Sequence, residues 1–370
     1  MDFSLCLFAV NNNRLYLYCM NFFRLILLFP LSLLYDLTTS VRNMLFERGI
    51  FPSETMNVNV ISIGNLNTGG SGKTPFTEYI AKIMNEHNFR VAVLSRGYKR
   101  KSKGFRIADA ASSAEEFGEE ALQHVENLPF APVAVCESRR LGIQMLLQEC
   151  PDLDLVLLDD AFQHRYVKPS LSILLTDFSH PYYRDFLLPS GNLRESSRFA
   201  KRADILIVTK CPTNLPPQEM KKTERELKPA PHQSLFFTSI RYHHPMHIIT
   251  KKELILDKEQ TVLLVTGIAN ATPLMDYIKS KTGGVIHLSF RDHHSYSRKD
   301  LLRIKSAFDL IDHSAKLILT TQKDAIRLRK LMQDTQLESL PFYLIPIHVE
   351  FLNNQSEQFI KTLISYVGKN

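Results

Sequence analysis

The chain has 370 residues, of which 44% are hydrophobic and 22% charged, and its mean hydropathy is −0.12. This composition excludes a disordered chain, a collagen-like repeat and a polytopic membrane protein, and the length predicts two domains. The net charge of +7 predicts an anionic partner such as phosphate, nucleic acid or an acidic membrane surface. The five cysteines form no C-x-x-C pair, which argues against a disulfide framework or a zinc ribbon and favours a reduced, cytoplasmic setting.

The first fifty residues differ in composition from the rest. Residues 22–35 form an apolar run, interrupted by Arg24 and Pro30, that is too short to cross a bilayer and has no signal-peptide cleavage site after it. Further apolar side chains then recur at helical spacing: Leu37, Val41, Met44 and Leu45. We expect residues 22–50 to form a helix on a membrane surface, and a helix packed on the protein's own core is the alternative. Translation from Met20 is a further hypothesis.

After residue 52, apolar runs alternate with segments of helical periodicity. Strands are expected at 58–63, 91–94, 153–158, 172–176, 205–209 and 235–242, with helices at 75–87, 114–125 and 139–148. A second set of strands is expected at 262–266, 285–289, 317–320 and 342–349. This alternation predicts an α/β fold with a mostly parallel sheet covered on both faces. We divide the chain into an N-terminal extension with the membrane helix (1–50), a phosphate-binding domain (51–240) and a smaller α/β domain that closes the nucleotide cleft (241–370).

A glycine-rich loop follows the first expected strand and opens a helix. It reads Asn67-Thr68-Gly69-Gly70-Ser71-Gly72-Lys73-Thr74. Glycines let successive backbone N–H groups turn toward phosphate oxygens, and a helix N-terminus favours negative charge. We expect Lys73 to reach the β- and γ-phosphates and the Thr74 hydroxyl to ligate Mg²⁺. The loop therefore predicts a P-loop NTPase-like domain, although Asn67 stands where the strict pattern has glycine.

Two carboxylates end the apolar strand expected at 153–158. Asp159 and Asp160 follow its last residue, at the sheet edge that also carries the glycine-rich loop. A carboxylate in this place holds Mg²⁺ directly or through water. Paired aspartates can instead cap the next helix. The neighbouring glycine-rich loop favours the metal.

A later strand end indicates which nucleotide is bound. Residues 208–212, Val-Thr-Lys-Cys-Pro, resemble the base-reading strand end of GTP-binding proteins but lack the aspartate that reads guanine, which favours ATP. The loop also resembles that of membrane- or DNA-associated partitioning ATPases, which have a lysine where this chain has Thr68. A membrane-recruited ATPase switch without a small-molecule acceptor is therefore the second hypothesis. We expect no nucleic acid partner, because the sequence has no basic strand with interleaved aromatic residues.

Several segments, in a consistent order along the chain, resemble the tetraacyldisaccharide 4′-kinase family, the lipid A 4′-kinases of Gram-negative bacteria. They are IGNLNTGGSGKTP (63–75), LSRGYKRKSKG (94–104), LLDDAFQHR (157–165), LPSGNLRES (188–196), VTGIAN (265–270), FRDHHSY (290–296) and TTQKDAIRL (320–328). The resemblance implies transfer of the γ-phosphate of ATP to the 4′-hydroxyl of a tetraacylated glucosamine disaccharide 1-phosphate, which gives lipid IVA. It also implies two α/β domains with the nucleotide between them, attached to the cytoplasmic face of the inner membrane.

The resemblance also implies the residues that activate the acceptor hydroxyl. The family role is ascribed to the aspartate of a G-D-E-P motif, paired with the first histidine of a D-H-H motif. The matching positions here are Glu119, in a G-E-E-A segment, and His293, with Asp292 available to orient it. Glutamate is one methylene longer, and small misplacements of a catalytic group can cost roughly 10²-fold in rate. The alternatives are an exposed acidic helix at Glu119 and a catalytically silent member of the family.

Basic and polar residues near the loop are assigned to the lipid substrate. They follow strands expected to end beside the glycine-rich loop, or lie in the segments that carry the resemblance: Arg96, Arg100, Lys101, Gln163, His164 and Glu195. The carboxyl ends of parallel strands are where such sheets bind ligands, and cations there suit a substrate phosphate or a lipid headgroup. A merely solvated basic face is the alternative for the lysines and arginines.

Overall fold

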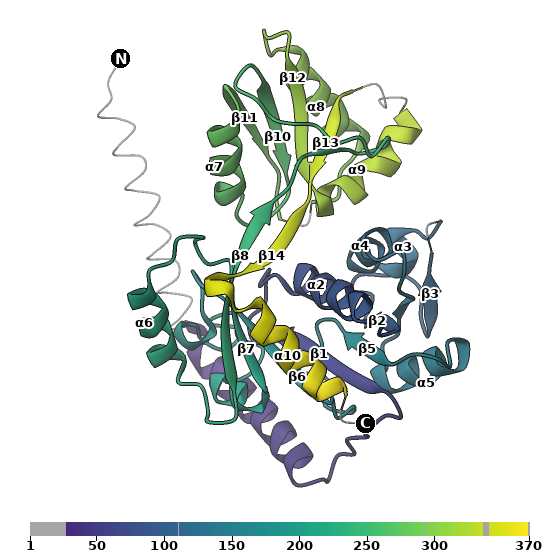
Figure 1. The fold of residues 1–370 in the computed structure, drawn as a ribbon, viewed down its shortest axis with the longest axis vertical. Coiled ribbons are helices and arrows are strands. Elements are labelled where there is room, and N and C mark those ends of the chain that lie inside the picture. Colours follow the sequence, from purple (N-terminus) through teal and green to yellow (C-terminus); the bar gives the residue numbers. More distant parts are fainter. Residues whose placement is uncertain (1–26, 110, 293, 336–339, 369–370) are drawn as a thin grey trace.

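The computed structural model describes residues 27–109, 111–292, 294–335 and 340–368. Two lobes, each built on its own sheet, lie one above the other in Figure 1. The larger lobe has a nine-stranded sheet and the smaller a five-stranded sheet. The predicted α/β fold, with a mostly parallel sheet and a second, smaller α/β unit, is confirmed.

The sheet of the larger lobe is parallel at its centre and antiparallel at both edges. Its strand order is β14-β8-β7-β6-β1-β5-β2-β4-β3. The strands are β1 Asn59–Asn65, β2 Val91–Ser95, β3 Arg106–Ala108, β4 Val133–Val135, β5 Leu155–Leu158, β6 Leu171–Asp177, β7 Ile205–Thr209, β8 Ser234–Tyr242 and β14 Ile347–Phe351. β3 pairs antiparallel with β4, and β14 with β8. The carboxyl ends of the central strands therefore meet at one edge, where ligands bind in such sheets.

Helices cover both faces of this sheet, as its near-continuous apolar strands require. They are α2 Lys73–Glu86, α3 Ala114–Phe117, α4 Glu119–Asn127, α5 Arg139–Glu149, α6 Pro217–Leu227 and α10 Ser356–Val367. On one face, Ile61 of β1 packs in a core with Phe76 of α2 and Phe359 of α10. On the other face, Val60 of β1 packs in a core with Ile143 of α5. Neighbouring residues of β1 thus point to opposite faces of the sheet, and both faces are buried.

The smaller lobe has the strand order β11-β10-β12-β13-β9. Its strands are β9 Met246–His247, β10 Thr261–Thr266, β11 Gly284–Ser289, β12 Lys316–Thr321 and β13 Phe342–Ile345, and its helices are α7 Thr272–Lys281, α8 Arg298–Asp309 and α9 Gln322–Thr335. Leu263 of β10, Ile304 of α8 and Leu328 of α9 share one buried core. This lobe therefore has a hydrophobic core of its own.

Two strands connect the lobes. β8 runs from the larger sheet toward the smaller lobe, and β14 returns beside it (Figure 1). The strand expected at 342–349 is in fact β13 and β14, because Pro346 between them has no N–H to continue the ladder. The chain from Ile347 to Val367, assigned from the sequence to the second domain, therefore returns to the larger lobe. There the ring of Phe359 packs against Phe76, with ring centroids 5.7 Å apart.

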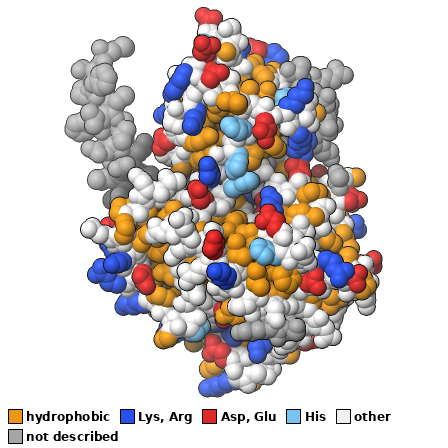
Figure 2. All heavy atoms as spheres, in the orientation of Figure 1, with side chains coloured by type: hydrophobic (Ala, Val, Ile, Leu, Met, Phe, Trp, Pro, Cys, Tyr) orange, Lys and Arg blue, Asp and Glu red, His pale blue; other side chains and the backbone are white. Residues whose placement is uncertain are grey.

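Histidine side chains gather between the lobes on the face shown in Figure 2. His243 and His348, at the ribbon of β8 and β14, stack with ring centroids 3.8 Å apart. Burial, followed by the charges of His243 and Lys82, lowers the pKa of His348 to about 4. His348 is therefore uncharged at neutral pH, which lets the two rings pack closely.

The local structure around α3 and α4 differs from the single helix expected at 114–125. Gly118 separates the two helices with a φ of 87°, and a Cβ at this position would lie 2.9 Å from the carbonyl oxygen of Tyr98. Only glycine fits both the backbone angle and this close approach. The short strands β3 and β4 were also not expected, because three residues carry too little pattern to identify a strand.

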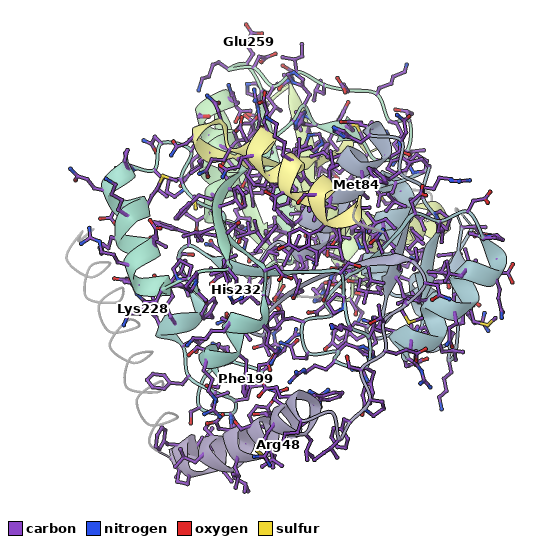
Figure 3. All side chains as sticks on the ribbon, turned by 60° about the horizontal axis from the view of Figure 1, so that its bottom comes forward. Arg48, Met84, Phe199, Lys228, His232 and Glu259 are labelled. Atoms are coloured by element: carbon purple, nitrogen blue, oxygen red, sulfur yellow. The ribbon has the colours of Figure 1, made fainter. Side chains whose placement is uncertain are left out.

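Residues 27–47 form a helix across the lower end of the larger lobe in Figure 1. In Figure 3 it runs beneath the segment that carries Phe199, and Arg48 follows its last turn. Within the part of the chain that the structure describes, no helix has the length and apolar character needed to span a membrane. Met20 and Arg24 lie outside the described residues.

Candidate active site

The glycine-rich loop joins β1 to α2 at the edge where the parallel strands end. Gly69 and Gly72 have φ values of 128° and 82°, in the range that favours glycine. Gly72 is the N-cap of α2, and no side chain caps this helix end. The hydroxyl of Ser71 is buried and has no hydrogen-bond partner among the described residues. The loop therefore presents unpaired donors at a helix N-terminus, which is an arrangement that binds phosphate.

The start of the loop is anchored to the segment before η2 (Ser197–Arg202). The Asn67 side chain donates to Asp185 Oδ2 at 2.8 Å, and the N–H of Thr68 donates to the carbonyl oxygen of Asn192 at 2.7 Å. Asn67, in the place of the glycine of the strict pattern, thus ties the loop to the protein. These contacts leave the loop from Gly69 onward to receive a ligand.

Lys73 begins α2 and reaches back toward the strand ends. Its Nζ donates to Asn65 Oδ1 at 3.1 Å and lies 3.6 Å from Asp160 Oδ1. Its side chain is only 10% exposed. A nearly buried ammonium group needs compensating negative charge, and phosphate oxygens in the loop would provide it.

Asp159 is buried, and its carboxylate is fixed by surrounding groups. Oδ1 accepts from Thr77 Oγ1 at 3.2 Å and from the N–H of Asp160 at 3.0 Å, and Oδ2 lies 3.0 Å from His124 Nε2. The other nitrogen of His124 lies 3.5 Å from Glu78 Oε1. Burial disfavours a charged imidazole, but the two carboxylates outweigh it and raise the pKa of His124 to about 10. His124 in turn outweighs the burial of Asp159 and lowers the pKa of that carboxyl.

Asp160 has different surroundings. Its φ of 47° turns the chain sharply after Asp159. Arg194 NH1 donates to both of its carboxylate oxygens, at 2.9 and 3.0 Å, and Lys73 is its second cation. The Asp160 side chain is 30% exposed. Asp160 is therefore the outer carboxylate of the pair and Asp159 the inner one.

A third carboxylate, that of Glu195, links this region to the N-terminal helix. Both of its oxygens accept from Arg202, at 2.8 and 2.9 Å. Gln163 donates to Glu195 Oε1 at 3.1 Å and to the carbonyl oxygen of Asn65 at 2.8 Å. Asn43 of the N-terminal helix donates to Glu195 Oε2 at 2.8 Å. Gln163 and Glu195 are thus brought together at the end of β1.

The first turn of α4 lies between this region and the smaller lobe. Arg327 of α9 donates to both oxygens of Glu119, at 2.7 and 2.5 Å. Glu120 Oε1 lies 3.9 Å from Lys323 Nζ. Burial, and then the charge of Asp159, raises the pKa of Glu120. The turn therefore offers two carboxylates, one paired across the lobes and one close to the inner aspartate.

A sequence profile of the LpxK family, described as tetraacyldisaccharide-1-P 4′-kinase, matches residues 24–366. The chain belongs to the tetraacyldisaccharide 4′-kinase family. Proteins named tetraacyldisaccharide 4′-kinase from Bacteroides thetaiotaomicron and Flavobacterium johnsoniae are 44% and 42% identical to it. The first match covers 93% of each chain, and the second covers 95% of this chain and 99% of the relative. A crystal structure of LpxK from Aquifex aeolicus in complex with ATP has a TM-score of 0.71 at 30% identity and covers 92% of this chain and 98% of that one.

In this member of the tetraacyldisaccharide 4′-kinase family, two of the assigned substrate residues are engaged elsewhere. Arg100 pairs with Glu137 at 2.6 Å, and its side chain is only 3% exposed. Lys101 pairs with Glu115 at 2.8 Å. These ion pairs brace the segment between β2 and α4. The structure does not bring Arg100 and Lys101 into the cluster around Gln163 and Glu195.

Arg96 is one of several guanidinium groups that lie around His164. Arg96 is exposed after β2, and His164 is half-buried after the paired aspartates. Burial, followed by the charges of Arg139, Arg42 and Arg96, lowers the pKa of His164 to about 4. An uncharged imidazole among guanidinium groups is a setting that suits an anionic ligand.

His293 lies outside the described residues. Its neighbour His294 stacks on Phe290, with ring centroids 4.8 Å apart, and its Nε2 lies 3.1 Å from Asp300 Oδ2. Asp300 also forms the capping box of α8 with Ser297. His294 therefore belongs to the structure at the start of α8, and the pairing of Glu119 with His293 stays a prediction.

Oxygen donors near the loop fit a magnesium ion that is bound together with a nucleotide. They are the hydroxyl of Thr74 at the start of α2 and the carboxylates of Asp159 and Asp160. Magnesium at such sites takes few protein ligands and shares the phosphate oxygens. Within the described residues, no group of three or more His, Cys, Asp or Glu side chains is placed to hold a metal.

Several residues of the site had no assigned role from the sequence. Arg194 and Arg327 lie inside segments that carry the family resemblance, so those segments could have indicated them. Glu120 lies beside the predicted Glu119 and becomes distinct only through its surroundings. His124 has no motif, because its role depends on α4 packing against Asp159.

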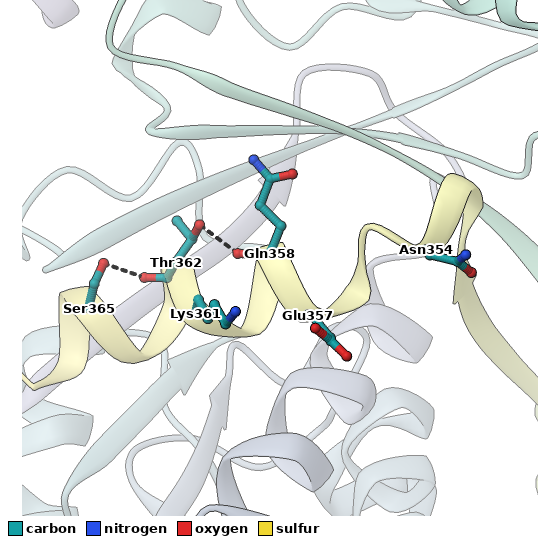
Figure 4. A pocket seen from close by; sticks show the side chains of 6 residues that line it. All are labelled: Asn354, Glu357, Gln358, Lys361, Thr362 and Ser365. Carbon is teal, nitrogen blue, oxygen red and sulfur yellow. Dashed lines mark hydrogen bonds between the residues drawn. The ribbon is translucent and has the colours of Figure 1, made fainter.

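A separate surface hollow of about 490 Å³ lies on α10 and includes no residue of the glycine-rich loop. Figure 4 shows its lining side chains: Asn354, Glu357, Gln358, Lys361, Thr362 and Ser365. The hydroxyls of Thr362 and Ser365 donate to carbonyl oxygens within the same helix. These two hydroxyl groups are therefore already engaged within α10.

Proposed function

We propose that this protein is an ATP-dependent kinase that phosphorylates the 4′-hydroxyl of a tetraacyl glucosamine disaccharide 1-phosphate, giving lipid IVA in lipid A biosynthesis. The observation that carries the proposal is a glycine-rich loop with unpaired donors, set beside Lys73 and two strand-end carboxylates in a member of this family. The Aquifex aeolicus LpxK structure was determined in complex with ATP, which supports ATP as the phosphate donor.

Phosphoryl transfer requires mainly positioning and charge stabilisation from the protein. In our proposal the loop N–H groups and Lys73 hold the β- and γ-phosphates, and Thr74 with Asp159 or Asp160 holds Mg²⁺. The bound metal ion supplies positive charge at the phosphate oxygens. Thr77 and His124 already hold Asp159 in place. This carboxylate therefore needs no reorganisation as negative charge develops on the oxygens of the transferred phosphoryl group.

The acceptor hydroxyl has to lose its proton as its oxygen attacks the γ-phosphorus. The bond from that phosphorus to the β,γ-bridging oxygen breaks, and ADP leaves. We propose that Glu119, together with His293, accepts this proton. Glu120 is the second candidate, because its raised pKa and its place near Asp159 suit a general base. Arg327 has to release or share the carboxylate of Glu119 before that residue can accept a proton.

The helix of residues 27–47 supports a location at a membrane surface, where an acylated acceptor resides. Its solvent-facing side chains are apolar and exposed: Leu27, Leu31, Leu34, Leu37, Val41 and Met44. Its buried side chains are Ser32, Asn43 and Phe46. Ser32 donates to Ser190 Oγ at 2.8 Å, and Asn43 donates to Glu195. An ordinary surface helix buries its apolar stripe, whereas most of the apolar side chains of this helix are exposed, and their burial in lipid explains the pattern. The cytoplasmic face of the inner membrane, where ATP is present, is the proposed location.

The acceptor also carries a phosphate, for which the cation group around His164 and Arg96 is the proposed contact. Gln163 and Glu195 are proposed to meet the sugar, because Gln163 donates both to the carbonyl oxygen of Asn65 at the end of β1 and to Glu195. Arg100 and Lys101 can contact the substrate only if their present ion pairs open.

A kinase assay in detergent micelles with γ-labelled ATP and the disaccharide 1-phosphate tests the proposal. We expect label in the lipid, and a loss of at least roughly 10²-fold in kcat for Lys73→Ala, because the phosphates lose their ammonium partner. Lys82→Ala, on the same helix, is the matched control and should keep its activity. Hydrolysis of ATP without lipid phosphorylation would instead support the membrane-recruited ATPase switch, and neither activity would indicate a catalytically silent member.

A further inference from the structure

Asp324 is a buried carboxylate of the smaller lobe that the proposed mechanism does not use. It lies in the first turn of α9. Its Oδ2 accepts from the N–H of Gly267 at 3.0 Å and from the hydroxyl of Thr321 at 2.8 Å. Its Oδ1 accepts from Arg327 at 3.1 Å. The carboxylate is therefore held at both oxygens and has a cation beside it, as a buried charge requires.

Asp324 also lies where separate parts of the smaller lobe meet. Gly267 follows β10, and the space around its Cα is closed by other groups. A Cβ at this position would lie 3.1 Å from Asp324 Oδ1, 3.2 Å from the carbonyl oxygen of Arg291 and 3.3 Å from Tyr296 Oη. These residues belong to the three segments that carry the family resemblance in the smaller lobe: 265–270, 290–296 and 320–328. Those segments thus converge on one buried carboxylate.

Arg327 extends from this fixed point to the larger lobe. It lies one helical turn after Asp324, on the same face of α9, and its side chain is only 6% exposed. One amino group of the guanidinium donates to Asp324, while Nε and the other amino group donate to the two oxygens of Glu119. A guanidinium is planar and holds its donors in a fixed fork. Asp324 therefore determines the direction in which Arg327 presents its fork to Glu119.

Two other cations of α9 face α4 on the same side of the smaller lobe. Lys323 Nζ lies 3.9 Å from Glu120 Oε1, and Arg329 pairs with Glu126. Their side chains are 33% and 24% exposed, and among the described residues neither also binds a carboxylate of its own lobe. Ion pairs of this kind contribute little to holding a geometry. Arg327 is therefore the cation of α9 that can set the position of a carboxylate on α4.

The fork leaves Glu119 able to accept a proton. An ionised carboxylate has about four lone-pair positions, and the two N–H groups of Arg327 occupy one on each oxygen. The acceptor hydroxyl has to approach one of the others as its oxygen attacks. Because small misplacements of a catalytic group are costly in rate, a residue that aims the carboxylate affects the reaction without touching the substrate.

Building on the proposed kinase function, we propose that Arg327 is a positioning residue for the carboxylate that activates the acceptor, and that Asp324 holds Arg327 in place. The smaller lobe then does more than cover the nucleotide, since it fixes the direction of a side chain of the larger lobe. A displaced smaller lobe would leave Glu119 without its fork. Phosphoryl transfer and docking of the lobes are therefore linked through one residue.

Steady-state kinetics of the full-length protein with the lipid acceptor, together with equilibrium ATP binding, test this proposal. We expect Arg327→Met to lower kcat about 30- to 100-fold. The Kd of ATP should change less than twofold, because the residues proposed to hold ATP lie in the larger lobe. Arg327→Lys keeps a cation beside Asp324, so the buried charge stays balanced if the methionine variant folds poorly. It loses the fork and should recover only part of the activity.

The neighbouring ion pair supplies a matched control. Arg329→Met removes the contact with Glu126 across the same two helices and should keep kcat within about twofold of the wild type. Equal losses in Arg327→Met and Arg329→Met would show that the interface only docks the lobes. Full activity in Arg327→Lys would show that the charge suffices and would refute the fork.

A double-mutant cycle separates positioning from a general loss of structure. If Arg327 acts through Glu119, then Arg327→Met should lower kcat less than about threefold further in a Glu119→Gln background. The same factor in both backgrounds would refute the positioning role. If the wild-type protein did not phosphorylate the lipid, the proposed function itself would fail instead.

Discussion

At the scale of single residues, His124 holds together two carboxylates that would otherwise repel each other inside the larger lobe. It lies between Asp159 and Glu78, and all three side chains are buried. Gln123 and Asn127 add hydrogen bonds to Glu78 at 3.0 and 2.8 Å. The central imidazolium therefore lies between the two acids and balances their charge.

We expect His124→Leu to reduce the free energy of unfolding by about 3–5 kcal/mol, the usual effect of leaving a buried charge unpaired. His87→Leu, at an exposed histidine that follows the last residue of α2, should change it by less than about 0.5 kcal/mol. Urea unfolding without nucleotide or Mg²⁺ measures both variants. A loss for His124→Leu no larger than that of the control would show that the network does not stabilise the fold.

The same residue predicts a pH dependence. Because the folded-state pKa of His124 is raised to about 10, its protonation contributes stability that is complete below about pH 6.5, the unfolded value, and is lost as the pH rises toward 10. The difference in unfolding free energy between wild type and His124→Leu should therefore be larger at pH 7 than at pH 10. An equal difference at the two pH values would contradict a charged imidazole in the folded protein.

Candidate site residues that lie in a recognisable sequence motif could be predicted from the sequence. Residues whose surroundings depend on tertiary packing could not. Lys73 follows a glycine-rich loop, and the paired aspartates follow a strand end. A lysine or an aspartate at these positions is typical of phosphate and magnesium binding. His124 and Glu120 lie on the same short helix as ordinary polar residues. Their roles arise from the packing of α4 against Asp159, which no local pattern in the sequence records.

At the scale of elements, α4 is the contact between the nucleotide site and the smaller lobe. One face of it meets Asp159 through His124, and the other meets α9. At the far end of α4, Gln322 donates to Asn127 Oδ1 at 2.9 Å, and Glu126 pairs with Arg329. If the smaller lobe moves, it must therefore either break these contacts or move α4 with it.

The first turn of α4 predicts which carboxylate serves catalysis. Arg327, itself held by Asp324 at 3.1 Å, orients Glu119 at the boundary of the two lobes. We therefore expect Glu119→Gln to lower kcat by about 10²-fold or more with little change in ATP binding, and Glu120→Gln to lower it less. Steady-state kinetics with the lipid acceptor, together with equilibrium ATP binding, measure this. The reverse order would place the general base at Glu120.

Elements were predictable where their pattern was long, and less so where a single residue divides them. Apart from β4 and β13, the parallel strands of the core begin and end within two residues of their expected bounds. The helix at 114–125 was divided by Gly118 and the strand at 342–349 by Pro346, each through a backbone restriction that acts at one position. The return of β14 to the larger sheet is a long-range pairing, which periodicity does not indicate.

At the scale of the whole molecule, a chain of contacts joins the N-terminal helix to the nucleotide site. Asn43 of the helix binds Glu195, Glu195 binds Gln163, and Gln163 binds the carbonyl oxygen of Asn65 at the end of β1. Arg42 adds a hydrogen bond to the carbonyl oxygen of Gln163 at 3.1 Å. The helix that we propose to contact the lipid is thus hydrogen-bonded to the site that would receive an acceptor from the lipid.

The apolar face of that helix gives the prediction that concerns the molecule as a whole. Leu31 and Leu34 are 53% and 59% exposed, so replacing both with serine removes apolar surface without opening the core. At roughly 1 kcal/mol for each partly inserted leucine, binding to vesicles of anionic phospholipid should weaken about 10- to 30-fold. Leu302→Ser, 51% exposed on α8 of the smaller lobe, is the matched control and should bind as the wild type does. Flotation of the full-length proteins with vesicles measures the difference, and the thermal midpoint of unfolding should stay unchanged in all of them. Equal flotation of the double variant and the wild type would mean that another surface meets the membrane.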